Sequence, residues 1–215
     1  MPDRTPGRLG VLGGTFDPPH HGHLWLAASA ADAMRLDRVV FMPAAVPPHK
    51  ADRVVTEVAD RIAMTQAAIA GDEAFTVSTL ELERPGPSYT VDSVERLLAD
   101  RGDAGPTYLI MAADSLEQIG TWREPDRLLQ LVEWIVGPRP GHRSADREAL
   151  RARFGEAANR IHLLDGPALD VSGSEIRERV ASGQTIRYLV PRAVEEYIGE
   201  HRLYRTTDER SDRPG

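Results

Sequence analysis

The sequence predicts an α/β fold, a Rossmann-like, doubly wound and mainly parallel sheet with helices on both faces. Two observations lead to this prediction. Short apolar runs rich in β-branched residues alternate along the chain with segments of helical spacing. Runs such as RVVFM and YLIM are apolar throughout, which is typical of strands buried on both faces.

The expected elements follow from this alternation. Strands are predicted at residues 9–12, 39–42, 75–80, 108–111, 134–136 and 161–164. Helices are predicted at residues 24–36, 57–69, 91–98, 126–131, 146–154, 174–180 and 192–201. Strands connected through helices run parallel by right-handed crossovers, and such sheets bind ligands beyond the carboxyl ends of their strands.

Length and composition predict one globular domain. With 215 residues, of which 41% are hydrophobic and 27% charged, the chain can bury a single α/β core. No internal repeat is present in the sequence. Residues 1–205 are therefore expected to form the domain, and the polar, aperiodic residues 206–215 a disordered tail.

Charge and cysteine content restrict the partners. The net charge of −7 argues against binding to nucleic acid or anionic membranes, which requires a basic surface. No apolar run is long enough to span a membrane, and the start MPDRTPGRLG has no apolar signal region, so a soluble, cytoplasmic protein is expected. Without cysteine, disulfides and thiolate zinc sites are excluded. The sequence is compatible with a homo-oligomer.

The segment GGTFDPPHHGH, residues 13–23, is predicted to bind an anion. Gly13 and Gly14 permit positive φ and let backbone N–H groups approach a ligand. The helix that follows adds unpaired N–H donors and a partial positive charge, so phosphate is the expected ligand. His20 and His23 are three residues apart and can face one bound group, whereas His21 should point elsewhere.

Two alternative roles for this segment remain open. Its three histidines could bind a metal with Asp17 as the nearby carboxylate, although a metal site does not account for the glycines. Alternatively, the glycines and prolines only make a tight turn that carries surface histidines. The pattern is neither the dinucleotide fingerprint GxGxxG nor a Walker loop.

A second motif, VSGSEIRERV, spans residues 171–180. Ser172 and Glu175 have the spacing of a capping box, which starts a helix. Ser174 and the first backbone N–H groups could form another anion-binding concavity, with Arg177 one turn further to clamp oxygens. Alone, the segment fits better as a capped helix with a solvent-facing arginine. Together with residues 13–23, it predicts a second contact to the same phosphates.

Lysine occurs once among the 26 basic residues, at Lys50. This favours a position that does not tolerate the broader guanidinium, although a chance occurrence on a solvated loop accounts for it equally well. Residues 44–54 contain prolines and lack the hydrophobic periodicity of a helix or strand, so they are the candidate for a loop that closes over substrates.

These motifs resemble those of a known group of enzymes. GGTFDPPHHGH, followed about 150 residues later by SGSEIR, resembles the nucleotidylyltransferase superfamily with its HxGH motif. GGTFDP, PPHK, PSYTVD and ADSLEQIGTW, in this order, resemble the bacterial nicotinate-mononucleotide adenylyltransferase family over nearly the whole chain. The resemblance implies that ATP and nicotinate mononucleotide are joined into deamido-NAD and pyrophosphate, in NAD biosynthesis. Mg²⁺ would be carried by the ATP phosphates.

The resemblance also implies an ATP site. His20 and His23 match the motif histidines that hold the phosphates, Arg177 grips the departing phosphates, and these three residues carry the catalysis. Asp114 matches the acid that hydrogen-bonds ribose. The implied ATP-binding residues are Gly13, Gly14, Thr15, Phe16, His20, His23, Asp114, Ser172, Ser174 and Arg177.

For the acceptor, the resemblance implies that a loop reads the nicotinate carboxylate and that Trp122 stacks on the pyridine ring. Arg139 would lie near the mononucleotide phosphate. The implied acceptor-binding residues are Lys50, Ser88, Tyr89, Thr90, Trp122 and Arg139. Without the resemblance, Trp122 would be predicted to pack in the core and Asp114 to cap a helix.

One residue departs from the family pattern. Ala112 stands two residues before Asp114, where the family has glycine, and its methyl group could crowd the nucleoside or alter the loop. Two alternatives therefore remain beside the implied reaction. One is a relative that uses another acceptor, such as nicotinamide mononucleotide, phosphopantetheine or a polyol phosphate. The other is a nucleotide-binding sensor without turnover. An aminoacyl-adenylate enzyme is disfavoured, because no KMSKS-like motif or basic face is visible.

Overall fold

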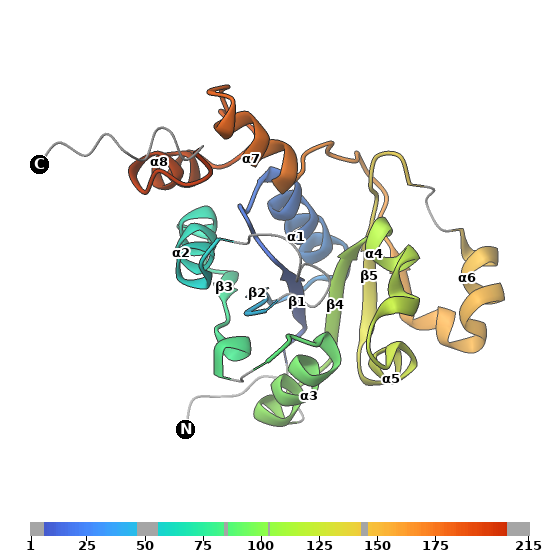
Figure 1. Cartoon of the computed structure of the whole chain (residues 1–215). Helices are drawn as coiled ribbons and strands as arrows, with labels where there is room; N and C mark the ends of the chain where they lie inside the picture. Colours follow the sequence, from blue (N-terminus) through green and yellow to red (C-terminus); the bar gives the residue numbers. More distant parts are fainter. Residues whose placement is uncertain (1–6, 47–55, 84–85, 103, 143–145, 206–215) are drawn as a thin grey trace, which may run out of the picture.

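The computed structural model describes residues 7–46, 56–83, 86–102, 104–142 and 146–205. In this part of the chain, a parallel sheet has the strand order β3-β2-β1-β4-β5-β6 and carries helices on both faces (Figure 1). The predicted doubly wound α/β fold is confirmed. The strands are β1 (Leu9–Gly14), β2 (Arg38–Pro43), β3 (Phe75–Val77), β4 (Thr107–Ala112), β5 (Glu133–Gly137) and β6 (Ile161–Leu163).

Successive side chains along a strand point to opposite faces of the sheet, and each face packs against its own layer of helices. The helices are α1 (His21–Met34), α2 (Val58–Ile69), α3 (Thr90–Arg101), α4 (Ala113–Glu117), α5 (Pro125–Leu131), α6 (Arg147–Phe154), α7 (Gly173–Ala181) and α8 (Arg192–Glu200). Ile110 of β4 packs on the face covered by α1 and α2, whereas Leu109 and Met111 pack on the face covered by α3 to α6. Short 3₁₀ turns lie at η2 (Leu80–Glu83), η3 (Ile119–Thr121) and η4 (Gly155–Arg160).

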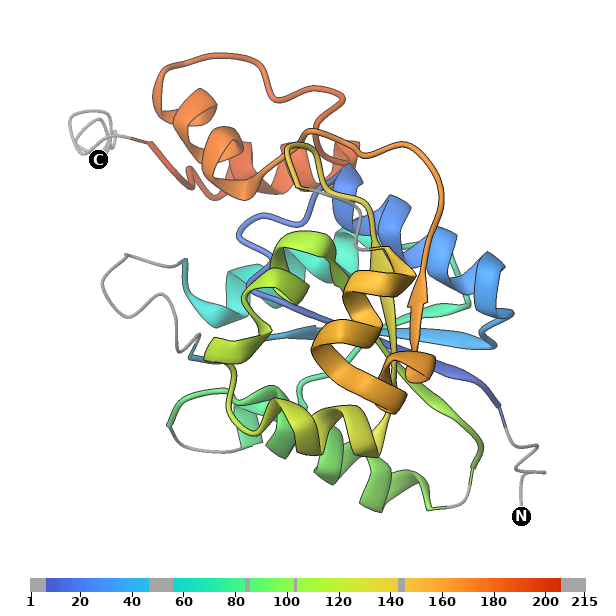
Figure 2. The same cartoon turned by 90° about the vertical axis from the view of Figure 1, so that its right-hand side faces the viewer.

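The last two helices extend the molecule beyond one end of the sheet. α7 and α8 lie at the top in both views (Figures 1 and 2). They pack on α2 through a separate apolar cluster that includes Met64, Ile176, Val194 and Ile198. This arrangement places the start of α7 above the carboxyl end of β1.

Two strands are shorter than predicted, β6 by one residue and β3 by three. The strand expected over residues 75–80 ends at Val77, and residues 80–83 form the 3₁₀ turn η2. The Leu80 N–H donates to the Ser78 side chain (3.2 Å), a local bond that replaces the next rung of the sheet. Glu81 lies within this turn.

Some predictions fall outside the described residues. These are Lys50, most of the candidate closing loop at residues 44–54, and the expected tail at residues 206–215. Among the described helices, none is both long and apolar enough to cross a membrane.

The sheet reverses its order between β1 and β4. Successive crossovers lead from β1 to β2 and β3 on one side, and from β4 to β5 and β6 on the other. Such a switch point leaves a crevice at the carboxyl ends of the two central strands, because the connecting segments diverge to opposite sides. Ligand binding is therefore expected where β1 ends in Gly13-Gly14 and β4 ends in Ala112.

Candidate active site

A cavity of about 480 Å³ occupies this switch point. Its walls come from the ends of β1 and β4, the starts of α1, α3 and α7, and the turn around Trp122. It is lined by every predicted site residue that the structure describes, namely Gly13, Gly14, Thr15, Phe16, His20, His23, Ser88, Tyr89, Thr90, Asp114, Trp122, Arg139, Ser172, Ser174 and Arg177. Residues separated by more than 150 positions thus meet around one space.

The backbone of the loop after β1 differs from the expectation in one respect. Positive φ occurs at Phe16 (φ 50°), not at Gly13 or Gly14. A Cβ on Gly14 would lie 3.1 Å from the buried Phe16 ring, so this glycine makes room for that ring. Gly13 has no atom within 4 Å of its would-be Cβ, which leaves its backbone open on the cavity side. The two glycines therefore serve close approach rather than unusual dihedrals.

His20 and His23 stack on each other at the start of α1, with ring centroids 3.7 Å apart. The His20 backbone N–H donates to His23 Nδ1 (3.3 Å), so neutral His23 carries its proton on Nε2. A Cβ on Gly22 would lie 3.0 Å from His20 Nδ1, which is why glycine separates the pair. As predicted, His21 points elsewhere, since it lines a different hollow. Its backbone N–H donates to Leu189 O (3.0 Å).

His20 is almost fully buried, at 5% exposure. Burial lowers its pKa to about 4, and the positive charges of Arg139 and His21 act in the same direction. Its ring is therefore neutral at pH 7. Its Nδ1 is buried without a hydrogen-bond partner in the described part of the chain. His20 also lines the cavity, so its neutral ring is within reach of a polar ligand atom there.

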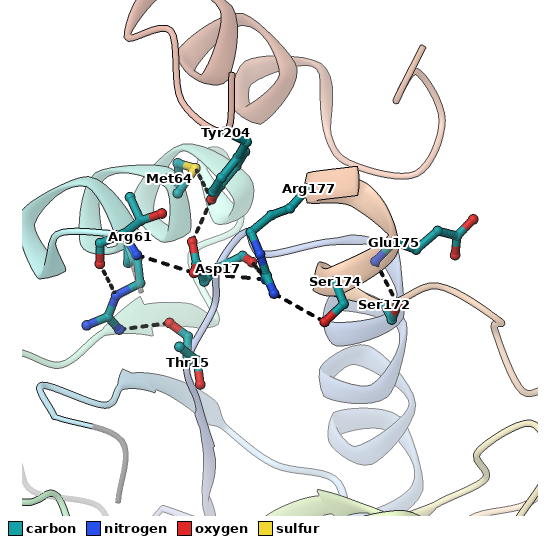
Figure 3. Close-up of polar contacts among 10 residues, drawn as sticks. Thr15, Asp17, Arg61, Met64, Ser172, Ser174, Glu175, Arg177 and Tyr204 are labelled. Carbon is teal, nitrogen blue, oxygen red and sulfur yellow. Dashed lines mark hydrogen bonds and ion pairs between the residues drawn. The ribbon is translucent and has the colours of Figure 1, made fainter. Parts of the chain in front are cut away.

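α7 reaches the loop after β1 through Arg177 (Figure 3). The Arg177 guanidinium donates to the Asp17 carbonyl oxygen (2.6 Å) and to Ser174 Oγ (3.1 Å). A Cβ on Gly173 would lie only 2.9 Å from the same Asp17 oxygen, so the helix begins in direct contact with the loop. The Glu175 N–H donates to Ser172 Oγ (3.2 Å), one of the two bonds of the predicted capping box.

A buried arginine that no sequence motif identifies supports the loop from behind. Arg61 on α2 is 1% exposed. It donates to the carbonyl oxygen of Thr15 (2.8 Å; Figure 3). It also donates to the carbonyl oxygens of Ala44 (2.7 Å), Ala45 (3.2 Å) and Thr56 (2.9 Å). Burial lowers the pKa of its guanidinium, and the nearby Asp17 carboxylate opposes this change. Arg61 thus fixes the backbone of segments 15–17 and 44–45 in relation to each other.

The opposite wall is built from two loops and the start of α3. Ser88 Oγ accepts hydrogen bonds from the N–H groups of Ala45 (3.0 Å) and Val46 (3.3 Å), and so joins the two loops. Tyr89 is the residue before α3 and Thr90 its first residue, so the unpaired N–H groups of this helix lie at the cavity wall. These N–H groups and the helix dipole favour an anionic group here.

Asp114 and Arg139 form a half-buried pair between the two walls. Arg139 Nε lies 3.5 Å from Asp114 Oδ2, and the guanidinium also donates to the Val171 carbonyl oxygen (3.1 Å). Ala112, not Asp114, is the residue before α4. The φ and ψ of Ala112 are −90° and 163°, an ordinary extended conformation, so its methyl group imposes no backbone strain.

Arg123 and Glu81 also line the cavity, although no sequence motif predicts them as site residues. Arg123 lies over the Tyr89 ring, 4.9 Å from its centroid, and 3.8 Å from Asp92. Its position directly after Trp122 was the available signal. Glu81 accepts from the Ser93 hydroxyl (2.8 Å) and has no signal in the sequence, because the apolar pattern predicts a longer strand that ends just before it.

The described residues contain no group of three histidine, aspartate or glutamate side chains that could hold a metal ion. The arrangement instead offers imidazole, guanidinium and backbone donors, which is a donor set for phosphate oxygens.

Comparisons with known proteins agree with this donor set. The family model described as cytidylyltransferase-like matches residues 11–179. A protein of Thermomicrobium roseum named probable nicotinate-nucleotide adenylyltransferase is 46% identical over 201 residues, which cover 94% of this chain and 93% of that protein. A protein of Symbiobacterium thermophilum with the same name is 45% identical and covers 92% and 95% of the two chains.

Solved structures support the fold. Nicotinic acid mononucleotide adenylyltransferase of Plasmodium falciparum, complexed with NaAD, has a TM-score of 0.77 at 18% sequence identity. The match covers 92% of this chain and 97% of that one.

Proposed function

Because the chain belongs to the cytidylyltransferase-like family and, within it, to the nicotinate-nucleotide adenylyltransferases, we propose that it joins ATP to nicotinate mononucleotide. The products are nicotinate adenine dinucleotide, also called deamido-NAD, and pyrophosphate, and the reaction belongs to NAD biosynthesis. The observation that carries the proposal is that the starts of α1 and α7 open onto one cavity, with His20, His23, Ser174 and Arg177 among its lining residues. We call these four residues the triphosphate end.

The chemistry requires alignment and charge stabilisation. A phosphate oxygen of the mononucleotide attacks the α-phosphorus of ATP, and the bond from that phosphorus to the bridging oxygen breaks with its electron pair leaving on pyrophosphate. The attacking phosphate is already ionised at pH 7, so no general base is needed. Catalysis then depends on holding the reacting atoms in line and stabilising the charge that develops on the phosphoryl oxygens.

The two histidines are suited to the α-phosphate. His23 carries a proton on Nε2, and His20 is a buried neutral ring with one unpaired nitrogen. Both can donate to phosphate oxygens, and the negative charge of the bound phosphate strengthens this donation. Gly22 and the exposed backbone of Gly13 let the phosphate approach the loop closely.

Arg177, Ser174 and the start of α7 are suited to the departing pyrophosphate. The guanidinium is already held by the Asp17 carbonyl and the Ser174 hydroxyl, so little rotational freedom is lost on binding. The helix dipole of α7 adds a fixed positive potential. Mg²⁺ enters as part of the substrate, bound to the ATP phosphates. Asp114 is assigned to the ribose.

The acceptor occupies the other wall, which we call the acceptor end and define by Ser88, Tyr89, Thr90, Trp122 and Arg139. Trp122 provides a flat surface for the pyridine ring, and Arg139 provides a cation for the mononucleotide phosphate. The start of α3 and the Ser88 hydroxyl favour the nicotinate carboxylate over a neutral carboxamide. Lys50 is assigned to the phosphates from the sequence alone. The protein is proposed to act as a soluble enzyme of the cytoplasm.

The experiment is product detection by mass spectrometry. The purified chain is incubated with ATP, Mg²⁺ and either nicotinate mononucleotide or nicotinamide mononucleotide. Deamido-NAD formed faster than NAD supports the proposal. Preference for nicotinamide mononucleotide, or for phosphopantetheine in a parallel assay, identifies another acceptor. ATP binding without product from any acceptor indicates a nucleotide sensor.

A further inference from the structure

The segment after α8 contacts the loop that forms the triphosphate end. The Tyr204 hydroxyl donates to Asp17 Oδ1 (2.7 Å), across 187 positions of sequence (Figure 3). The Tyr204 ring lies in the apolar cluster of α2, α7 and α8, and its hydroxyl is 3.9 Å from Met64 Sδ. Nothing in the sequence motifs connects Tyr204 with the site.

Asp17 is the junction between this tyrosine and Arg177. Its carboxylate is 7% exposed and lies within reach of three groups. These are the Tyr204 hydroxyl, the Thr56 N–H at 3.4 Å and the Arg177 guanidinium at 3.9 Å. The carbonyl oxygen of the same residue accepts the shorter bond from Arg177 (2.6 Å). Asp17 therefore contacts Arg177 through both its main chain and its side chain.

Tyr204 is protonated at neutral pH, and its hydroxyl is therefore a hydrogen-bond donor. Burial raises its pKa above the ordinary value, and the Asp17 charge adds to this rise. The opposing influences of Thr56 and Arg177 are smaller. The protonated hydroxyl thus gives the buried carboxylate a permanent neutral partner, so that Oδ1 does not need to be satisfied by a cation.

We propose that Tyr204 is a positioning residue of the triphosphate end: its hydroxyl holds the Asp17 carboxylate in the orientation that leaves Arg177 directed at the ATP phosphates. The inference rests on the proposed function in assigning Arg177 to the triphosphate. When the hydroxyl is removed, Oδ1 loses its donor in a buried environment. The carboxylate then rotates toward the nearest cation, Arg177, and closes the 3.9 Å gap. A tighter ion pair with Asp17 competes with the phosphates for the guanidinium.

The test compares two tyrosine-to-phenylalanine variants that lose the same kind of bond. Tyr204→Phe removes the hydroxyl at Asp17. Tyr197→Phe, the matched control, removes a hydroxyl that donates to Asp60 (2.8 Å) between α8 and α2, and neither residue lines the cavity. Dissociation constants for ATP with Mg²⁺ are measured by calorimetry, KM values for both substrates by steady-state kinetics, and thermal midpoints for both variants.

We expect Tyr204→Phe to weaken ATP binding about tenfold, while the KM for nicotinate mononucleotide changes less than about twofold. Both variants should lower the thermal midpoint by a few degrees, but Tyr197→Phe should leave ATP binding unchanged. In an Arg177→Ala background, adding Tyr204→Phe should raise the dissociation constant for ATP by less than about twofold, because the effect of Tyr204 passes through Arg177.

Each other result overturns the inference. Wild-type ATP affinity in Tyr204→Phe means that the hydroxyl is not needed for Arg177. Equal losses of affinity in the two variants mean that both act through stability alone, and an undiminished effect in the Arg177→Ala background means that Tyr204 acts by another route. Failure of the unmodified chain to bind ATP at all contradicts the proposed function, and is therefore distinguishable from these outcomes.

Discussion

The two ends of the cavity are built differently. Around the triphosphate end, Arg61 and Arg177 donate hydrogen bonds to backbone carbonyl oxygens. Arg61 is 1% exposed, and Asp17, the partner of Arg177, is 7% exposed. Beside the acceptor end, Arg123 is 50% exposed, in an ion pair of 3.8 Å. Exposed pairs of this length contribute little stability. Arg177 and Arg139 are similarly exposed, at 29% and 26%, so the two ends differ in the contacts that surround these arginines.

This difference suggests a division of roles. A site fixed by buried bonds is preorganised, so binding energy goes into holding the phosphates in their reactive geometry. A site made of solvated charges discriminates between acceptors through electrostatics and tolerates change. Substitutions at the triphosphate end should therefore reduce turnover or ATP binding, whereas substitutions at the acceptor end should weaken acceptor binding or alter the choice of acceptor.

The largest expected effect is on turnover at the triphosphate end. His23→Ala should lower kcat by about two orders of magnitude or more, the scale of losing one oxyanion donor, without loss of the fold. His21→Ala is the control, because His21 faces a different hollow. The readout is single-turnover formation of deamido-NAD together with the thermal midpoint. A His23→Ala enzyme with normal turnover would remove the histidines from the mechanism.

The next effect concerns stability and pH. The pKa of His20 is lowered to about 4 in the fold, against an ordinary value of 6.5. As the pH falls from 6.5 towards 4, the unfolded chain takes up a proton that folded His20 does not, so the free energy of unfolding decreases, by at most about 3 kcal/mol.

Urea unfolding between about pH 7 and pH 4 measures this slope. His20→Gln should flatten it, and saturating ATP should also reduce it, because bound phosphate favours the protonated ring. A variant with the same slope as the unmodified chain would assign the pH dependence to other groups.

A third prediction compares Arg177 of the triphosphate end with Arg139 of the acceptor end. Arg177→Ala should raise the KM for ATP, and Arg139→Ala the KM for nicotinate mononucleotide, each by about ten- to thirtyfold, which is the loss of one charge-assisted bond. Each variant should leave the KM of the other substrate within about threefold. Steady-state kinetics with one substrate saturating measures both values. Equal rises for both substrates in either variant would contradict two separate ends.

The smallest expected effect is at Arg123, which is half exposed and already paired with Asp92 and Glu124. Arg123→Ala should lower kcat/KM for the nicotinate acceptor about two- to threefold and leave the nicotinamide acceptor unchanged, because only the former carries a negative carboxylate. Arg127→Ala is the matched control, since Arg127 pairs with Glu95 on the surface and does not line the cavity. A uniform decrease with both acceptors would indicate a packing effect.

Much of the fold was predictable because its signals are periodic. The apolar runs of β1, β2, β4 and β5 and the helical spacing of α2 and α8 each extend over several residues, so one exception does not hide them. The end of β3 was not predictable, because it depends on one local bond from Ser78. The positive φ at Phe16 was not predictable for a similar reason, because it accompanies a contact of this one ring with Gly14.

The site residues also differ in whether a repeated or spaced pattern in the sequence identifies them. His20, His23 and Arg177 were found because each belongs to a short motif with a fixed spacing. Arg61 and Tyr204 were missed because each is a single residue whose partners lie far away in sequence, at Thr15 and Asp17. Only the folded chain brings these groups together, and no spacing rule applies to a contact of that kind.

The long reach from Asp17 to Arg177 and Tyr204, over 160 and 187 positions, also has a consequence for synthesis of the protein. A ribosome makes the glycine-histidine loop early and its two partners late, so a growing chain exposes the loop long before anything can close on it. Full nucleotide affinity thereby becomes one of the last properties that the nascent polypeptide acquires, and ATP stabilises a molecule fully only after its translation has passed Tyr204.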